Sequence, residues 1–417
     1  MKLEDHIIGR LSAARRAAHA LALAPTERKN RALTLLSTML REACQPILAA
    51  NREDLAVARA EGNTAAFIER LTLDQTRVAA MAHSLEEIVA LADPNGETIA
   101  HWRRPNGLEI AQVRVALGVI AIIYESRPNV TIDAGALAIK AGNAAVMRGG
   151  REALHTNRAL AGLIGEALGR AGLDREAIVF IDDPDREVIQ ILKRHPEAID
   201  LIIPRGGKAL KQALAGSEVP ILPHFDGICH TYVDRAADLA MAAEICFNAK
   251  CSRPSVCNAM ETMLVHAEVA PRFLAMIATR LRAAGVELRG CERTCKLIDE
   301  AIPATPQDWD TEYLGLILAV KIVDSVDEAV GFIAQHGSGL ADAIVTGDTA
   351  SAARFAREVD SATVYVNAST RFTDGFEFGF GAETGISTNR LHARGPMGLR
   401  ELTTYKYVIH GRGQTRT

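Results

Sequence analysis

Apolar residues recur at helical spacing through the first hundred residues of the chain. They fall at Leu33, Leu36, Leu40 and Ile47, with spacings of three, four and seven positions. This is the period of one helix face, and residues 51–60 and 71–91 continue it. Asp-Pro-Asn-Gly at 93–96 then supplies strong helix breakers. We therefore expect a helical region that ends before residue 93.

The pattern changes to alternation of apolar and polar residues at 101–115. An Asn-Gly pair at 106–107 lies within this stretch, and Asn-Gly is a strong signal for a hairpin turn. We predict a protruding hairpin here. Residues 402–409 alternate again, which predicts an edge strand near the C-terminus.

Short apolar runs and helical patterns alternate between residues 118 and 215. The predicted strands are 119–123, 144–147, 178–181 and 199–203. The predicted helices are 132–140, 152–171, 187–193 and 206–215. Strands that alternate with helices indicate a parallel sheet with crossover helices. Such a sheet binds ligands at the carboxyl ends of its strands.

A second α/β unit begins near Cys229. Its predicted strands are 230–233, 258–265, 314–323, 341–345 and 363–366, and its predicted helices are 236–247, 271–284 and 326–335. The tail at 367–400 is rich in glycine and polar residues, and loops of this length in a compact domain are usually functional or disordered. The phenylalanines interleaved in this tail favour an ordered loop.

Two strand-to-helix turns could bind an anion. They read Arg148-Gly149-Gly150 and Pro204-Arg205-Gly206-Gly207-Lys208. Glycines at such turns let backbone N–H groups reach a phosphate. Neither of the two common nucleotide-binding fingerprints, GxGxxG and GxxxxGK[ST], occurs there. An ordinary glycine turn with a solvated arginine is the alternative interpretation.

A polar stretch from residue 247 leads into Cys257 and the strand that follows it. Lys250, Arg253 and Asn258 flank this thiol in the sequence. Nearby cations favour the thiolate, which is the nucleophilic form of cysteine. The alternative is that Cys257 is a small buried apolar residue, as most free cysteines are.

Composition narrows the class of protein. A formal net charge of −4 over 417 residues provides no basic field for nucleic acid. The apolar run 115–124 is too short to span a bilayer, and the first ten residues lack a signal-peptide pattern. Seven cysteines without a CxxC pair fit a reducing cytoplasm, and they predict no metal site.

Several longer motifs identify a family resemblance. They are YESRPNVTIDAGALAIKAGNA from residue 124, RGG at 148, PRGG at 204, NAK and RP ahead of CNAMET at 248–262, and TRFTDG, FGFGAETGIST and LHARGPMGLREL after residue 369. Together they resemble the gamma-glutamyl phosphate reductases, a family of the aldehyde dehydrogenase superfamily. The resemblance covers nearly the whole chain.

The resemblance implies an α/β fold with two Rossmann-like three-layer α/β/α domains and a small β oligomerisation module. The implied ranges are 1–100 and 117–228 for the NADP-binding domain, 229–384 for the catalytic domain, 101–116 and 401–411 for the module, and 385–400 for a returning segment. In the superfamily this module extends a neighbouring subunit's catalytic sheet. We therefore expect a homodimer or higher homo-oligomer with the hairpin crossing to the partner; pairing within one chain is the alternative.

The implied reaction is the NADPH-dependent reduction of L-glutamyl 5-phosphate to L-glutamate 5-semialdehyde and phosphate. It is the second step of proline biosynthesis, in the cytoplasm, with the substrate supplied by glutamate 5-kinase. In the family, a cysteine thiolate attacks the acyl phosphate, phosphate leaves, and NADPH reduces the thioester. An acyl-CoA-dependent relative and a non-enzymatic binding protein of the same fold are the rival interpretations.

The resemblance also assigns roles to residues. Cys257 corresponds to the nucleophile and Glu312 to the glutamate at the nicotinamide ribose. Arg148 corresponds to a residue at the adenosine ribose and suits the 2′-phosphate of NADPH, and Gly149 beside it belongs to the cofactor site. The remaining correspondences are Arg205, Gly206 and Gly207 for the pyrophosphate and Asn129 for the oxyanion hole. His224 stands where hydrolytic relatives have a glutamate base, so a thioester would escape hydrolysis.

The substrate contacts are predicted from charge and position near Cys257. Lys250, Arg253 and Arg371 are candidates to hold the phosphate or the substrate carboxylate. Asn258, or backbone N–H groups near it, would stabilise the oxyanion. Solvated surface charges are the alternative for the three cations, and Cys251 has no functional explanation.

Overall fold

The computed structural model describes residues 3–125, 127–222 and 226–416. The chain forms two compact units. The first consists of Met1–His224, Gly379–Gly385 and Pro396–Thr417, and the second of Phe225–Phe378 and Ile386–Gly395. The predicted assignment of functions to ranges of the chain stays a prediction.

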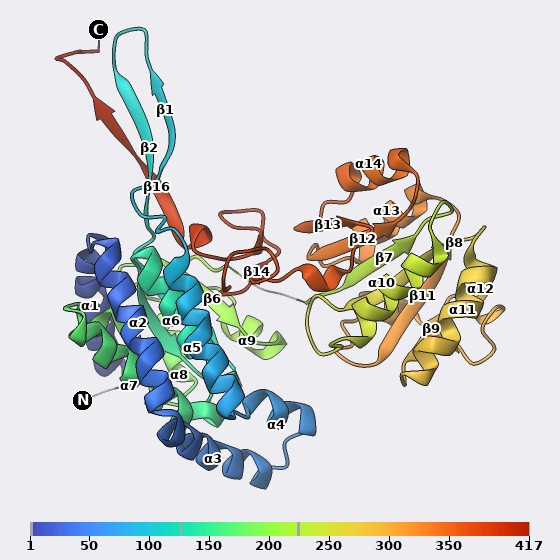
Figure 1. Cartoon of the computed structure of the whole chain (residues 1–417), viewed down its shortest axis with the longest axis horizontal. Coiled ribbons are helices and arrows are strands. Elements are labelled where there is room, and N and C mark those ends of the chain that lie inside the picture. The colour runs from blue at the N-terminus through green and yellow to red at the C-terminus, as the bar shows by residue number, and fades with distance from the viewer. Residues whose placement is uncertain (1–2, 126, 223–225, 417) are drawn as a thin grey trace. The chain divides into compact units, whose positions relative to one another are not determined.

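Helices dominate the first hundred residues, as predicted (Figure 1). The helices of the first unit are α1 (Leu3–Ala22), α2 (Thr26–Glu42), α3 (Cys44–Ala60), α4 (Ala65–Leu71), α5 (Gln75–Ala90), α6 (Asn129–Ala141), α7 (Leu154–Arg170), α8 (Glu187–Leu192) and α9 (Lys208–Ala213), with 3₁₀ turns η1 (Arg151–Ala153), η2 (Arg175–Ala177) and η5 (Arg400–Leu402). The expected helix at 71–91 is interrupted. Asp74 caps α5 by accepting a hydrogen bond from the backbone N–H of Arg77, so the helix begins at Gln75.

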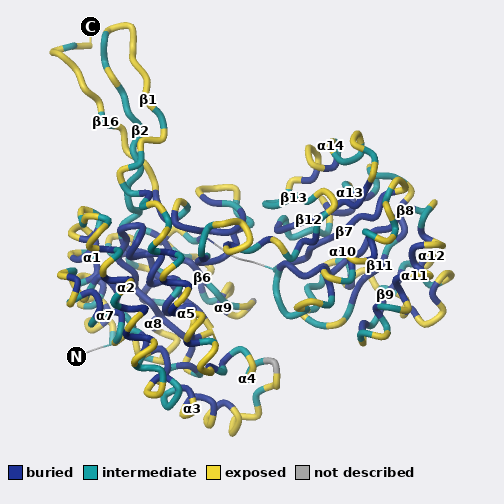
Figure 2. Tube along the Cα trace, in the orientation of Figure 1, coloured by how far each residue is buried: buried dark blue, intermediate teal, exposed yellow. Residues whose placement is uncertain are grey.

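A four-stranded parallel sheet forms the centre of the first unit. Its strands are β3 (Val119–Tyr124), β4 (Ala144–Arg148), β5 (Ile178–Phe180) and β6 (Leu201–Arg205), in the order β5-β4-β3-β6. Every residue of β3 and β4 is buried, and the tube is dark blue through this core (Figure 2). The predicted parallel sheet is thus confirmed, and the carboxyl ends of β4 and β6 bear the two Arg-Gly-Gly turns.

The predicted hairpin and edge strand are also confirmed. β1 (Thr98–Arg103), β2 (Glu109–Ala116) and β16 (Thr403–His410) form an antiparallel sheet in the order β1-β2-β16. Gly107 has a φ of 89° in the connecting turn, a conformation that glycine adopts without strain. The three strands extend away from the helices of the first unit (Figure 1). Crossing of the hairpin to a partner subunit stays a prediction.

A seven-stranded parallel sheet forms the core of the second unit. Its order is β10 (Ile302–Pro303), β9 (Glu287–Gly290), β11 (Ile317–Val323), β8 (Met260–His266), β7 (Cys229–Val233), β12 (Ala341–Val345) and β13 (Thr363–Val366). The helices of this unit are α10 (Leu239–Cys251), α11 (Ala270–Ala283), α12 (Glu292–Cys295), α13 (Val326–His336) and α14 (Thr349–Glu358), with 3₁₀ turns η3 (Pro306–Asp310) and η4 (Thr370–Phe372). The short strands β14 (Ile386–Ser387) and β15 (Gly395–Pro396) lie in the tail.

Three differences from the predicted elements affect the site or its surroundings. α10 extends to Cys251, so Asn248 and Lys250 belong to its last turn, whereas Arg253 follows the helix. The short strands β9 and β10 were not predicted. Neither was α14, in which Phe355 is the buried residue.

Within the described ranges, no helix combines the length and apolar character needed to cross a membrane.

Candidate functional site

Cys257 lies in the tight turn that leads from α10 into β8. The backbone N–H of Ala259 donates to the carbonyl of Val256 at 3.0 Å, which closes this turn. The thiol of Cys229 donates to the Cys257 carbonyl at 3.3 Å. Cys257 is half-buried and packs against the cluster of Cys229, Leu340, Ala341 and Ile386. The predicted nucleophile is therefore partly accessible and has a fixed backbone.

Gly227 links Cys257 to Glu312. Its backbone N–H donates to Glu312 Oε1 at 2.9 Å. A Cβ at this position would overlap the Cys257 carbonyl group, so only glycine allows the two backbones to approach this closely. The structure thus brings together the predicted nucleophile and the predicted ribose-binding carboxylate. Sequence analysis missed Gly227, although an Asp-Gly pair directly ahead of a buried strand was visible.

Arg371 interacts electrostatically with Cys257 and with Arg253. Arg371, in η4, donates from Nε to Ser252 Oγ at 3.2 Å and from Nη1 to Asn258 Oδ1. Burial lowers the pKa of Arg371, and the positive charge of Arg253 lowers it further. The negative charge of a Cys257 thiolate acts in the opposite direction and raises the pKa of Arg371. Two like charges this close to each other favour an anion between or beside them, and they favour the thiolate of Cys257.

Asn258 has a different set of contacts from the one predicted. Its side-chain Nδ2 donates to the carbonyls of Thr373, at 2.8 Å, and Arg371, at 3.5 Å. Thr370 Oγ1 donates to the Asn258 carbonyl at 2.7 Å. The side chain is 4% exposed. The side-chain amide of Asn258 thus bonds the turn before β8 to the tail. Backbone N–H groups therefore remain as the predicted oxyanion donors.

The side chain of Lys250 is fully buried, and its binding of the substrate stays a prediction. Its Nζ lies 2.5 Å from Glu261 Oε2, and Glu261 Oε1 accepts a hydrogen bond from the backbone N–H of Leu314 at 3.1 Å. Burial lowers the pKa of Lys250 and raises the pKa of Glu261 to about 7. The extension of α10 to Cys251 puts Lys250 on a buried helix face. Sequence analysis missed Glu261, whose partner is eleven residues away across the nucleophile turn.

Arg148 ends β4 and is 8% exposed. Its Nη2 donates to the carbonyls of Pro184, at 2.9 Å, and Asp185, at 3.5 Å, while its Nε has no partner among the described residues. Burial lowers the pKa of Arg148, and nearby carboxylates such as Glu152 oppose that shift. At Gly149 a Cβ would overlap the side-chain amide of Asn157.

The turn after β6 binds a carboxylate of the protein itself, that of Glu125. The backbone N–H of Gly207 donates to Glu125 Oε2 at 3.3 Å. A Cβ at Gly206 would lie 2.7 Å from the carboxyl carbon of Glu125. Arg205 Nη2 lies 4.0 Å from Glu383 Oε1. The turn therefore combines a guanidinium with a backbone donor that already binds a carboxylate.

Asn129 is the first residue of α6, and its Nδ2 donates to Asp133 Oδ2 at 3.0 Å. Asp133 also accepts from Ser84 Oγ at 3.1 Å, and burial raises the pKa of Asp133. Asn129 belongs to the first unit and Cys257 to the second, so the predicted oxyanion contact stays a prediction. His224 lies outside the described residues. Among the residues that are described, no group of three His, Cys, Asp or Glu side chains could hold a metal ion.

Known proteins resemble this chain along almost its full length. The model of the aldehyde dehydrogenase family matches residues 4–293 and 300–408. Gamma-glutamyl phosphate reductase of Carboxydothermus hydrogenoformans is 53% identical over 413 residues, 99% of this chain and 100% of that protein. That of Syntrophomonas wolfei is 50% identical over 415 residues, 99% of each chain.

A solved structure agrees with these relatives. The crystal structure of gamma-glutamyl phosphate reductase from Thermotoga maritima is 45% identical and superposes with a TM-score of 0.96, covering 99% of this chain and 100% of that one. The α/β architecture predicted from the motifs is thereby confirmed. The chain belongs to the aldehyde dehydrogenase family and, within it, to the gamma-glutamyl phosphate reductases.

Proposed function

We propose that this chain reduces L-glutamyl 5-phosphate to L-glutamate 5-semialdehyde and phosphate with NADPH, in the second step of proline biosynthesis. The observation that carries the proposal is that relatives named for this reaction match the chain from end to end at about half identity. The reaction belongs in the cytoplasm, where glutamate 5-kinase supplies the unstable acyl phosphate.

Cys257 is the proposed nucleophile. Its thiolate attacks the acyl carbonyl, a carbon–sulfur bond forms, and the phosphate leaves with the electrons of the broken carbon–oxygen bond. Arg371 interacts electrostatically with Cys257 and with Arg253. Both arginines would hold the phosphate or the substrate carboxylate through charge-assisted hydrogen bonds. Backbone N–H groups of the turn before β8 would stabilise the oxyanion.

The first unit offers residues that fit a nicotinamide dinucleotide. Arg148 presents a guanidinium with an unpartnered Nε, and Gly207 presents a backbone N–H that binds a carboxylate. We assign Arg148 and Gly149 to the 2′-phosphate, Arg205, Gly206 and Gly207 to the pyrophosphate, and Glu312 to the nicotinamide ribose. When bound, the cofactor supplies the hydride. Glu125 must leave the turn after β6 for a pyrophosphate to bind there, because two anions repel each other.

Assays of both directions test this proposal. Consumption of NADPH should require L-glutamyl 5-phosphate generated in the cuvette by a kinase. Oxidation of the semialdehyde by NADP⁺ should require inorganic phosphate as the acyl acceptor. The reason is that His224 replaces the glutamate base that would activate water to hydrolyse the thioester. Sustained oxidation with water alone would contradict the absence of a base that activates water. A requirement for coenzyme A would instead favour the acyl-CoA-dependent alternative.

A further inference from the structure

Glu312 lies in an irregular segment, residues 311–316, that joins η3 to β11. A carboxylate on a loop binds a ligand with fixed geometry only when surrounding residues hold the loop in place. The two residues that follow Glu312 are Tyr313 and Leu314. Each of them bonds to a buried carboxylate on a different element.

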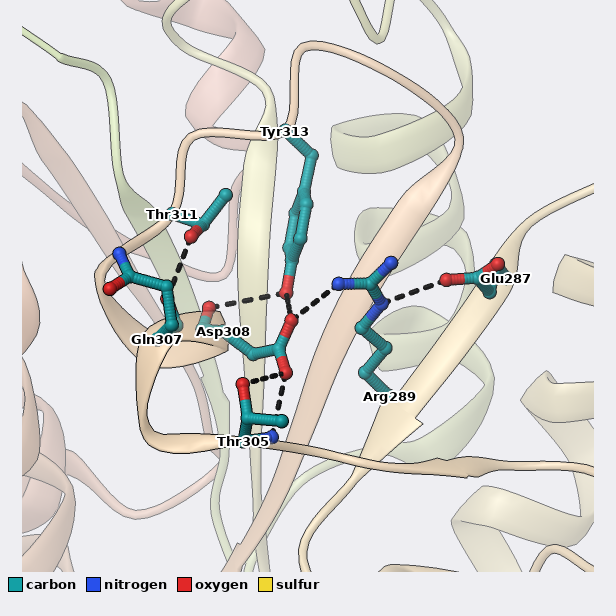
Figure 3. A network of polar contacts seen from close by, with 7 residues as sticks. All are labelled: Glu287, Arg289, Thr305, Gln307, Asp308, Thr311 and Tyr313. Atoms are coloured by element: carbon teal, nitrogen blue, oxygen red, sulfur yellow. Dashed lines mark hydrogen bonds and ion pairs between the residues drawn. The ribbon is translucent and has the colours of Figure 1, made fainter.

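The first of these carboxylates belongs to Asp308, which is 5% exposed (Figure 3). Its Oδ1 accepts from the Tyr313 hydroxyl at 2.9 Å and from Arg289 Nη1 at 2.6 Å. Its Oδ2 accepts from the backbone N–H and the hydroxyl of Thr305, at 2.7 and 2.8 Å. Both carboxylate oxygens are therefore fixed by donors from three separate residues.

The charges in this network favour its hydrogen bonds. Burial favours the neutral acid, but hydrogen bonds from Arg289 and Thr305 outweigh it and hold the pKa of Asp308 well below its usual range. Burial and the hydrogen bond to Asp308 raise the pKa of Tyr313, so its hydroxyl keeps its proton and donates. The Arg289 guanidinium also lies over the Tyr313 ring, 5.3 Å from the centroid.

The second carboxylate belongs to Glu261 on β8, the strand that follows the nucleophile turn. It accepts from the backbone N–H of Leu314 at 3.1 Å and pairs with Lys250. Leu314 has a φ of 53°, which is unusual for a residue with a side chain. Such a conformation persists only where the surroundings hold it.

We infer that Tyr313 is a positioning residue for Glu312, held by Asp308 and Arg289. The hydroxyl of Tyr313 fixes the segment on one side and the Glu261 carboxylate fixes it on the other. Glu312, which directly precedes both anchored residues, accepts from the Gly227 N–H beside Cys257. The network thus sets the distance between the ribose-binding carboxylate and the nucleophile turn. The inference rests on the proposed role of Glu312 at the nicotinamide ribose.

A double-mutant cycle on cofactor binding tests the inference. Tyr313→Phe removes the hydroxyl and keeps the ring. We expect it to raise the NADPH Kd, measured by fluorescence titration, about fivefold, which is the scale of one hydrogen bond. The same change in the Glu312→Gln background should raise the Kd no further, because Glu312 is the group through which Tyr313 acts.

Tyr232→Phe is the matched control. Tyr232 also donates from its hydroxyl to an aspartate, Asp234, at 3.0 Å, and it is fully buried. Both tyrosine variants should lower the urea midpoint of unfolding, but Tyr232→Phe should leave the NADPH Kd unchanged. A change in NADPH affinity therefore separates positioning from a loss of stability.

The outcomes distinguish this inference from the proposed function. If Glu312→Gln leaves the NADPH Kd unchanged, the assignment of Glu312 to the ribose fails, and the inference fails with it. If Glu312→Gln weakens binding but Tyr313→Phe does not, only the positioning role fails. Equal weakening by Tyr313→Phe in both backgrounds would also overturn it, because the hydroxyl would then act independently of Glu312.

Discussion

Cys257 and Cys251 lie in the same stretch ahead of β8 but differ in their surroundings, and this difference predicts their roles. Cys257 lies in the turn beside Gly227 and Arg371, whereas Cys251 ends α10 and burial raises its pKa. We expect Cys257→Ala to lower turnover by about four orders of magnitude or more while NADPH binding persists. Cys251→Ser should keep most of the activity. Similar inactivation by both changes in a steady-state assay would contradict this assignment.

The buried carboxylate of Glu261 predicts a pH effect on stability. Burial raises its pKa from 4.5 to about 7, so the native state binds more protons than the unfolded state between these values. The contribution of Glu261 is therefore present below pH 4.5 and is lost as the pH rises through about 7. Glu261→Gln cannot lose a proton, so its urea midpoint should rise relative to the parent protein over this window. Parallel profiles of the two proteins would rule out the raised pKa.

At the scale of elements, the ends of β4 and β6 carry the predicted cofactor contacts. Arg148→Ala should weaken NADPH much more than NADH, about tenfold or more, because a guanidinium binds the 2′-phosphate through paired hydrogen bonds that NADH lacks. Isothermal titration with both cofactors measures the ratio. Equal weakening of NADPH and NADH binding would show that another residue discriminates between the two cofactors. Loss of the bonds from Arg148 to the carbonyls of Pro184 and Asp185 would then explain the result, because it disturbs both cofactors alike.

The sequence predicted those elements whose signal is local. β3 reads as a continuous apolar run and all six of its residues are buried, so its place in a parallel sheet could be predicted. The same was true of the Asn-Gly turn of the hairpin. Lys250 could not be placed in this way, because its burial depends on Glu261 across the nucleophile turn. A long-range ion pair leaves no periodic pattern, and a charged residue at a helix end looks the same as one in a loop.

At the scale of the whole molecule, each unit has a core of its own around a parallel sheet. The motifs predicted this fold because they identify the family, whereas composition and periodicity alone give only an α/β protein. Division of the chain was harder to predict, since residues 379–385 and 396–417 return to the first unit while residues 386–395, between them, belong to the second. The spacing of apolar residues does not reveal such a return, because it does not indicate to which unit a loop belongs.

The exposed sheet of β1, β2 and β16 predicts assembly. β16 pairs with β2 along its whole length, yet Tyr405, Tyr407 and Ile409 on β16 are at least half exposed. An edge strand with large exposed side chains invites pairing with another chain. We predict at least a dimer, with the hairpin crossing to the partner's catalytic sheet. Light scattering should give a multiple of the 44.8 kDa chain mass, and removal of residues 402–417 should reduce it to the monomer. Circular dichroism of the truncated chain controls for unfolding. A full-length monomer with full activity would refute the prediction, because its catalytic sheet would then be complete without a partner.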